Sequence, residues 1–354
     1  MPLLQAPLAV RLADRADVRE RSRIEGFVRA HPEGTPFHLP QWSDAVAKAC
    51  GQRAYTLLAE RADGGLVAVL PLIAVSSPLF GKALVSNGFA TGGGILAENE
   101  GAVASLADSA WALAMALGCP TCELRGGPLP ERWQIDDHTY LNFSRPLAAS
   151  DEAELAAIPR KQRAEIRKAL GNALEIHVGH AAETHAHYRV YAESVRNLGT
   201  PVFPRALFGE ILQAFGAEAD ILTIRTPGGA AVASVLSLYM NATAYPYWGG
   251  GVQAARGLRA NDAMYFALMQ HSRARGCKTF DFGRSKAGTG AASFKKNWGF
   301  EGIPLSYAKR APDGQAPRDI NPLSARYRLQ VAAWKRLPLW VANRMGPVIS
   351  RGLG

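Results

Sequence analysis

The sequence predicts a mixed α/β protein made of two duplicated domains and a basic tail. The chain has 354 residues, of which 48% are apolar, so it can form two hydrophobic cores. Two stretches that begin with Thr-Pro, at Thr35 and Thr200, follow the same order of elements. Glycine turns and Gly-Cys pairs recur at corresponding places in both stretches. Repetition of one supersecondary plan indicates an internal duplication.

Each copy is predicted to contain a helix, a strand, a glycine turn, a second strand, a further helix and a last strand. Residues 1–30, before the first copy, fit an edge strand followed by a charged helix. Gly64–Gly65 and Gly228–Gly229 fit two-residue hairpin turns. Triple glycines at Gly92–Gly94 and Gly249–Gly251 precede the second helix of each copy. A helix between the last strands predicts a βαβ crossover.

The duplication leads us to expect three regions. Residues 1–148 are expected to form an N-terminal domain, and residues 149–310 a C-terminal domain that holds the active site. Residues 311–354 are expected to be a linker followed by a basic amphipathic tail. Either Asn261 or Asp262 is expected to cap the second helix of the C-terminal domain, because short polar side chains accept hydrogen bonds from a first turn.

Charge and hydropathy limit the classes of partner and compartment. The net charge of +10 favours anionic partners, such as nucleic acid, phosphorylated substrates or an acidic membrane face. No apolar run reaches the roughly 20 residues that a membrane-spanning helix needs. The N-terminus lacks the basic start and apolar block of a secretory signal. We therefore expect a cytoplasmic protein.

Two residues between positions 245 and 299 are candidates for catalysis. Alternation along a predicted strand places Asp281 opposite Phe280 and Phe282. Asp281 can act as a base or orient an amine, or it can be a structural acid that holds the next turn. Lys295 follows a glycine loop whose spacing is neither a P-loop nor a dinucleotide fingerprint. Aromatic neighbours are expected to limit where the lysine points.

Further residues of the same segment are candidates for substrate binding. The aromatic end of a strand can line a ligand site or belong to the core. The arginines before the second helix lie where a helix N-terminus binds anions. The glycine loop with its basic flanks can hold a phosphate or carboxylate, or be an ordinary surface loop. The candidates are Tyr247, Trp248, Gly249, Arg256, Arg259, Asn261, Gly283, Arg284, Ser285, Lys296 and Trp298.

A second basic segment is the helix predicted after Pro159. Arg160 and Lys161 begin it, and further cations follow against a single Glu165. Arg160 and Lys161 are candidates for contact with an anionic substrate or RNA. The alternative is a solvated helix face.

No residue pattern predicts a metal site. Cys119 and Cys122 have the C-x-x-C spacing, but Cys122 corresponds to Phe280 of the second copy, a predicted core position. We therefore expect buried thiols. The histidines between His177 and His187 follow no ligand template.

The tail combines cations with tryptophans. Residues 323–354 contain no acid. This composition fits an interfacial helix on an anionic membrane, which would make the protein peripheral at the inner membrane face. The alternative is a helix that docks on the protein itself.

The run YPYWGGG…LRANDAMYFALMQHSRARGCKTFDFGRS…SFKKNWGF and the segment PRKQRAEIRKAL resemble the FemAB/FemX family. The similarity covers nearly the whole chain, and the sequence looks most like FemAB-related proteins found with exosortase (PEP-CTERM) and exopolysaccharide systems. Wider relatives are BioF2-like acetyltransferases. The resemblance implies two tandem GNAT-like acyltransferase domains. It also places Lys295 at a family lysine that steadies the acyl-transfer intermediate, and Asp281 and Gly283 in the family's strand signature.

The resemblance implies an acyl- or aminoacyltransferase that acts on a cell-envelope glycan, an exopolysaccharide or a peptidoglycan-type, lipid-linked precursor. The acyl donor would be a co-substrate, either aminoacyl-tRNA or acyl-CoA, and no bound cofactor is implied. The loop at Arg256–Asn261 lacks the closely spaced glycines that cradle coenzyme A in GNAT domains. One rival function is a non-catalytic protein of the same fold that binds polysaccharide or anionic lipid. A second rival is an RNA-binding protein, although the sequence lacks RRM and KH signatures.

Overall fold

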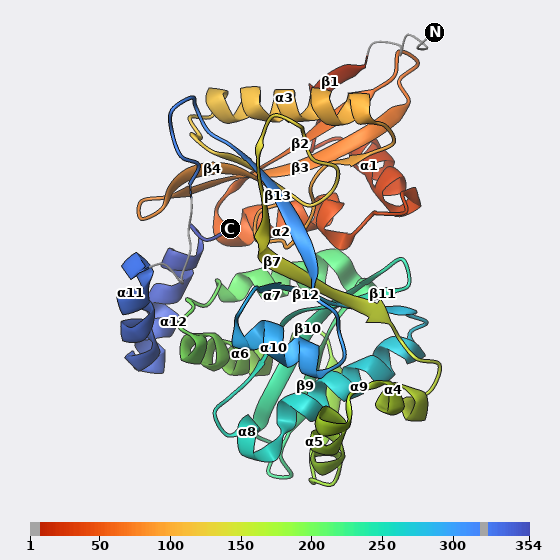
Figure 1. Ribbon diagram of the computed structural model, residues 1–354, viewed down its shortest axis with the longest axis vertical. Helices are drawn as coiled ribbons and strands as arrows, with labels where there is room; N and C mark the ends of the chain where they lie inside the picture. Colours follow the sequence, from red (N-terminus) through yellow and green to blue (C-terminus); the bar gives the residue numbers. More distant parts are fainter. Residues whose placement is uncertain (1–7, 319–324) are drawn as a thin grey trace. The chain divides into compact units, whose positions relative to one another are not determined.

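The chain folds as two units, each a sheet with helices packed against it (Figure 1). The computed structural model describes residues 8–318 and 325–354. The predicted mixed α/β class is confirmed. The two units comprise, respectively, residues 8–137, 306–318 and 351–354, and residues 138–305 and 325–350.

The sheet of the first unit has the strand order β1-β2-β3-β4-β6-β13, with β5 paired to β3. β4 and β6 are parallel, and the other neighbouring strands are antiparallel. β3 is buried on both faces, and both α2 and α3 pack against it. The strands are β1 (Ala9–Leu12), β2 (Arg53–Glu60), β3 (Leu66–Ser77), β4 (Gly81–Ser86), β5 (Leu96–Ala97), β6 (Cys122–Arg125) and β13 (Ile303–Arg310). The helices are α1 (Val18–Ala30), η1 (Pro36–His38), α2 (Pro40–Cys50) and α3 (Glu100–Ala116).

The sheet of the second unit has the strand order β7-β12-β11-β10-β9-β8. β11 and β12 are parallel, and the other neighbours are antiparallel. α6 and α9 pack against the central strands. The strands are β7 (Gln134–Pro146), β8 (Glu175–Gly179), β9 (Ala219–Arg225), β10 (Ala231–Met240), β11 (Thr243–Gly251) and β12 (Thr279–Lys286). The helices are α4 (Asp151–Ala157), α5 (Arg160–Leu170), η2 (Ala181–Glu183), α6 (Thr184–Leu198), α7 (Arg205–Phe215), η3 (Gly216–Glu218), α8 (Ala255–Leu258), α9 (Ala260–Ala274), α10 (Gly290–Asn297), α11 (Ala325–Arg336) and α12 (Leu339–Ser350).

The last strand of each sheet comes from a distant part of the chain. β7 follows β6 in sequence, but it pairs with β12 of the second unit, where Ser144 lies opposite Asp281. β13 follows α10 in sequence, but it pairs with β6 of the first unit, where Tyr307 lies opposite Arg125. The two copies therefore exchange their final strands. The three consecutive regions expected from the sequence, with boundaries after residues 148 and 310, did not include this exchange of strands.

The hairpin turns that join the duplicated strands have three residues and not the expected two. Backbone hydrogen bonds close the turns Arg61–Gly65 and Thr226–Ala230 at their first and last residues. The third turn residue lies in the left-handed region, with φ of 83° at Gly64 and 80° at Gly229. Such turns favour glycine at this position, where other residues would be strained. The two turns correspond with a shift of 165 residues, the same shift as at the start of the copies.

The helices that follow β4 and β11 begin in different ways. The Asn99 side chain caps α3 by accepting a hydrogen bond of 3.0 Å from the N–H of Ala102. The expected cap of α9 by Asn261 or Asp262 is wrong. α9 begins at Ala260, because Arg259 adopts the left-handed conformation, with φ of 52°, and turns the chain directly into the helix.

The tail forms two helices, α11 and α12, which both pack against α6. Within the described ranges, no helix is both long and apolar enough to cross a bilayer. The first seven residues, residues 319–324 and the side chains of residues 325–328 lie outside the described part of the chain. The beginning of the expected tail and the end of the expected linker fall there.

Candidate functional site

The parallel strands β11 and β12 form a fork. They pair at Thr243–Thr279 and Ala244–Phe280, and the described chain has no further ladder pairs between them. A bulge at Tyr247 shifts the register of β11 against β10, because Leu236 and Ser237 of β10 pair with residues 248 and 246. Bulges re-aim a strand and are frequent beside active sites. The candidate site lies at this fork.

Asp281 lies on β12 at the fork and is fixed to its own strand. Its Oδ1 accepts a hydrogen bond of 2.8 Å from the N–H of Gly283, and the Asn142 side chain on β7 also donates to it. Burial raises the pKa of Asp281 above its usual range, although both hydrogen bonds and the charge of Lys295 oppose the shift. The carboxylate thus holds a bulge of β12, at which the register against β7 changes.

Lys295 reaches the same bulge from α10. Its Nζ donates to the carbonyl oxygens of Gly283 at 2.8 Å and Arg284 at 3.0 Å. It also lies 5.4 Å from the ring centroid of Phe143 and 5.5 Å from that of Phe282. An ammonium has three N–H groups. Two bond these carbonyls, which leaves the third for a substrate oxygen.

Burial lowers the pKa of Lys295 from 10.5 to about 7. The charge of Asp281 opposes this shift, and the charge of Arg284 adds to it. Lys295 therefore titrates near neutral pH and exists there both as an ammonium and as an amine. A partly buried cation that is positioned in this way can stabilise an anion that develops beside it.

An aromatic cluster supports β12 and α10 from the core side. Phe280 and Phe282 pack together with ring centroids 5.3 Å apart, on the face of β12 opposite Asp281, as predicted. Trp298 is fully buried, and its Nε1 has no acceptor among the described residues. Trp248 is 3% exposed and packs against Phe208. The structure places both candidate tryptophans in the core, where they support the backbone and do not reach solvent.

The glycines at the end of β11 allow close packing. A Cβ at Gly249 would lie 3.0 Å from the Tyr265 hydroxyl, and one at Gly250 would overlap Ser194 of α6. A Cβ at Gly251 would lie 2.5 Å from Oδ1 of Asn261. That oxygen is buried and accepts no hydrogen bond within the described chain. Asn261 thus carries a buried amide oxygen to which no described residue donates a hydrogen bond.

The N-terminus of α9 is covered by α5. Gln162 donates to Asp262 at 2.6 Å, and Asn172 donates to the carbonyl of Leu258 at 2.8 Å. Arg259 forms an ion pair with Glu165. These contacts fix the connection between α8 and α9. They also place the Asp262 carboxylate in the first turn, where helix N-termini favour negative charge.

Several candidate cations are exposed around this corner of the second unit. A Cβ on Gly299 would lie 3.1 Å from Cδ of Pro159, so the end of α10 lies beside the beginning of α5. None of these cations forms an ion pair with another described residue. The exposed candidates are Arg160, Lys161, Arg256 and Lys296.

Residues of β7 complete the site and were not predicted. The Arg284 guanidinium lies 4.5 Å from the ring centroid of Tyr140, and Ser285 is buried. Asn142 and Phe143, on the same strand, contact the acid and the lysine. Nothing in the sequence of β7 indicates that it pairs with β12.

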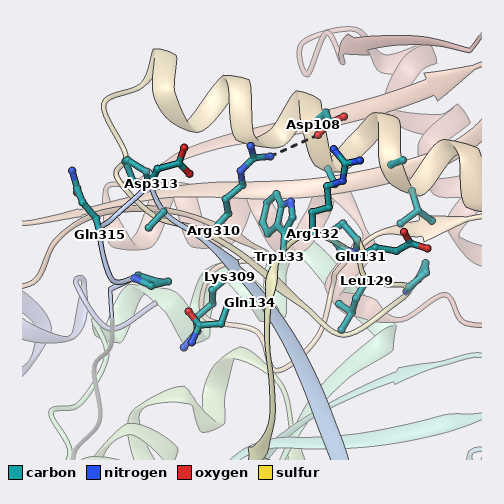
Figure 2. Close-up of a pocket in the computed structure, with 18 of the residues that line it drawn as sticks. Asp108, Leu129, Glu131, Arg132, Trp133, Gln134, Lys309, Arg310, Asp313 and Gln315 are labelled. Atoms are coloured by element: carbon teal, nitrogen blue, oxygen red, sulfur yellow. Dashed lines mark ion pairs between the residues drawn. The ribbon is translucent and has the colours of Figure 1, made fainter.

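The first unit has a hollow of about 880 Å³ beside α3 (Figure 2). Arg310 lies 3.7 Å from Asp108, and Lys309 lies 3.8 Å from Glu123. Because acids accompany its cations, the hollow lacks the strong positive charge expected of a polyanion site. It is lined by residues of α3 and of segments 128–134 and 309–317.

Cysteine and histidine do not form a metal centre in the described part of the chain. No group of three or more His, Cys, Asp or Glu residues there is arranged to hold a metal ion. Cys119 and Cys122 are buried free thiols, as predicted, and burial raises the pKa of both. His187 is buried, and its Nδ1 lies 3.0 Å from Oγ of Ser234. Burial lowers the pKa of His187 to about 3.

Residues 160–296 match the family described as "Acetyltransferase (GNAT) domain". This match includes α5, the fork and Lys295. A comparison with curated proteins finds no match.

Solved structures show the same fold over most of the chain. A crystal structure of FemX is 15% identical, covers 81% of this chain and 95% of its own, and has a TM-score of 0.64. A tandem GNAT protein from the clavulanic acid biosynthesis pathway is 10% identical, with coverages of 88% and 100% and a TM-score of 0.56. The C-terminal domain of a putative lysylphosphatidylglycerol synthetase from Agrobacterium fabrum is 12% identical, with coverages of 82% and 91% and a TM-score of 0.55.

The expectation of tandem GNAT-like units is confirmed. At these identities, the structural matches show the fold alone, and the family match supplies the class of chemistry. The chain is an acyltransferase whose second unit carries a GNAT domain.

Proposed function

We propose that this protein transfers an acyl or aminoacyl group to an amine or hydroxyl of a cell-envelope glycan, an exopolysaccharide or a peptidoglycan-type precursor. The observation that supports this proposal is Lys295, a partly buried cation at the fork with one N–H directed to no acceptor among the described residues. The sequence resemblance to FemAB/FemX proteins supports an envelope acceptor. The second unit would carry the chemistry.

In the proposed reaction, a nitrogen or oxygen of the acceptor attacks the carbonyl carbon of the donor. The carbonyl oxygen becomes an oxyanion, to which Lys295 donates its remaining N–H. When this intermediate collapses, the bond from the carbonyl carbon to the oxygen or sulfur of the donor breaks. The proton that the acceptor loses is taken up by that leaving atom, so the reaction needs no net acid or base.

Asp281 would act through Lys295. Its carboxylate favours the ammonium form of the lysine and holds the bulge whose carbonyls orient Nζ. We propose the same supporting role for Gly283, which lies in the left-handed region with φ of 70°. Arg284 and Ser285 continue the same strand and would border the acceptor.

The donor would be aminoacyl-tRNA or acyl-CoA, and the α9 terminus favours the former. Asp262 already places a carboxylate in the first turn, and Arg259 is already paired with Glu165. Both features disfavour a pyrophosphate at this terminus. Exposed cations suit a larger polyanion. Those proposed to contact its phosphates are Arg160, Lys161, Arg256 and Lys296.

The test uses purified protein with a lipid-linked envelope glycan precursor and two donors that are labelled in the acyl group. One donor is acetyl-CoA, and the other is a mixed pool of aminoacyl-tRNA. Label in the acceptor identifies the donor class. Lys295→Met is compared with Lys278→Met, a matched change at an exposed lysine outside the site. Transfer that is equally fast in both variants would remove the proposed role of Lys295. Absence of transfer from either donor, with retained glycan binding, would contradict the envelope activity.

A further inference from the structure

The tail helices dock on the second unit by one face only. On α12, Ala342, Gly346 and Ser350 are buried and recur every four residues, so they form one stripe. A Cβ on Gly346 would lie 3.0 Å from the backbone N of Val202, which shows how closely this stripe approaches its neighbour. The predicted alternative of a docked tail is therefore realised in part.

The opposite face of α12 is exposed and apolar. Trp340 is 75% exposed and Val348 is 64% exposed, and the exposed Arg344 lies midway between them. Positions 340, 344 and 348 share one helix face, about 160° from the buried stripe at 100° per residue. Met345, beside this exposed face, is also exposed. Docking thus leaves a large aromatic ring and an aliphatic chain in water around a cation.

α11 repeats this arrangement. A Cβ on Gly199 would meet Val331 and the Lys335 chain, and Arg196 donates to the carbonyl of Lys335 at 3.2 Å. On the opposite side of the helix, Leu329 is 80% exposed and Arg336 is exposed. We call these two exposed faces the tail surface. It consists of Leu329, Arg336, Trp340, Arg344, Met345 and Val348.

The charge of the tail indicates what the surface fits. The chain contains no Asp or Glu after Asp319, so nothing in this segment offsets its cations. Exposed aliphatic side chains gain little against the charged phosphate backbone of a nucleic acid, whereas they enter the acyl boundary of a bilayer. Tryptophan suits the headgroup level, and arginines suit anionic headgroups. We propose that the tail surface lies on an anionic lipid bilayer, with the helices parallel to it and not across it.

The proposal is independent of the acyl-transfer reaction, and it can be tested on the full chain. The protein is co-sedimented with vesicles of phosphatidylcholine alone, or of equimolar phosphatidylglycerol and phosphatidylcholine. Binding to the anionic vesicles alone is expected. Arg344→Glu should weaken it on the order of tenfold or more. Trp340→Ala should weaken it on the order of tenfold. Both changes are at exposed positions, so folding should be retained.

Matched controls separate a defined surface from general positive charge. Lys278→Glu changes the net charge as Arg344→Glu does, and Leu79→Ala removes a 65% exposed side chain of the first unit. Both should bind as the wild type does. Equal loss in Lys278→Glu and Arg344→Glu would overturn the proposal, as would equal binding to neutral vesicles or no binding to either. Retention by an acidic protein instead of vesicles would point to a protein partner and also overturn it.

Tryptophan fluorescence gives a second readout. The emission should shift to the blue when anionic vesicles are added, because an exposed indole enters an apolar layer. Trp340→Leu should abolish this shift while most of the binding is retained, since leucine keeps the apolar contact. A shift that persists in this variant would show that another tryptophan enters the lipid, and the proposed surface would be wrong.

Discussion

The two units repeat one plan but use the acid on their central parallel strand differently. In the sequence match of GCPTCELRG with GCKTFDFGR, Glu123 of β6 corresponds to Asp281 of β12. Glu123 accepts from Arg125 at 2.7 Å and lies 3.8 Å from Lys309, so it is neutralised within its own sheet. Asp281 instead holds a bulge and lies near Lys295.

The difference arises after the strand. In the second unit, β12 leads into α10, which carries Lys295 back to the bulge. In the first unit, residues 126–133 connect β6 to β7 without a helix. The duplication thus preserved the sheet and the acid, whereas the position of Lys295 depends on one short helix.

The largest effect is expected for Lys295→Met. Loss of one oxyanion donor should lower kcat by about 10²–10³-fold, by the precedent of such donors. Lys309→Met, beside the corresponding acid of the first unit, should leave kcat unchanged. Steady-state kinetics of both variants check this comparison, with circular dichroism to confirm folding. A large loss in Lys309→Met would show that both units take part in the chemistry.

Replacing one glycine of each unit with alanine should destabilise the two units to different degrees. The loss should be larger where the new Cβ meets backbone than where it meets a side chain. A Cβ on Gly94 would overlap the carbonyl oxygen of Gly126, a backbone atom that cannot turn away. A Cβ on Gly250 would overlap the Ser194 side chain, which can adjust in part. We expect Gly94→Ala to lower the free energy of unfolding by about 3 kcal/mol or more and Gly250→Ala by about 1–3 kcal/mol. Urea denaturation of both variants tests the order, and the reverse order would contradict this account.

The pKa of Lys295 predicts two opposite pH effects. If the ammonium stabilises the oxyanion, kcat should fall about tenfold per pH unit above the pKa of about 7. This fall of kcat at high pH, the basic limb of the rate profile, should be absent in Lys295→Arg, whose guanidinium stays charged. A limb that persists in that variant would belong to another group.

Stability should change in the other direction. Between the folded pKa of about 7 and the ordinary value of 10.5, the unfolded chain binds more protons at Lys295 than the folded chain does. The free energy of unfolding contributed by this group therefore rises with pH across that window. Wild type should gain stability relative to Lys295→Met from pH 7 to 10 in thermal denaturation. A constant difference would mean that burial does not shift this pKa.

Neutralising the two corresponding acids should affect different properties. Asp281→Asn keeps an acceptor for Gly283 but removes the charge that supports the ammonium of Lys295, so the basic limb should move to lower pH. Glu123→Gln should leave the rate profile unchanged and lower the free energy of unfolding by about 1 kcal/mol. The pH profile of kcat for both variants checks this. If Asp281→Asn abolishes activity at every pH, the acid would act directly.

The smallest effect is expected at the helix starts. Asn99→Ala removes the side-chain cap of α3 and should lower the free energy of unfolding by about 1 kcal/mol. Arg259→Gly relieves a left-handed residue but breaks the pair with Glu165, so a net change near zero is expected. Thermal denaturation of both variants compares the two starts. A larger loss in Arg259→Gly would mean that this ion pair stabilises the fold more than the cap does.

Much of the fold was predictable because the duplication repeats local signals. The order of helices and strands, the paired glycine turns and the inward face of β12 follow from residues that lie next to each other in sequence. The start of α9 was not predictable in this way, since the cap pattern at Asn261 and Asp262 does not reveal a left-handed Arg259.

Only the part of the candidate site that comes from one continuous segment was predictable from the sequence. Lys295 and Asp281 were predicted from one segment of about fifty residues. Their neighbours Asn142 and Phe143 come from β7. The sequence of a strand does not show which distant strand it pairs with, so these neighbours were not predictable. Burial was the other obstacle, because an aromatic residue at a strand end looks the same in sequence whether it faces a ligand or, as with Trp248, the core.

The exchange of β7 and β13 also constrains how the chain can become folded. β6 lacks its β13 partner until Ser306–Arg310 has left the ribosome, about 180 residues after β6. Contacts between segments so far apart are slow to form. Cutting the chain between the two copies would take β13 from β6 and β7 from β12, and each would become an open edge prone to aggregation. Neither copy can therefore complete its sheet alone during synthesis, although the sequence is a tandem repeat.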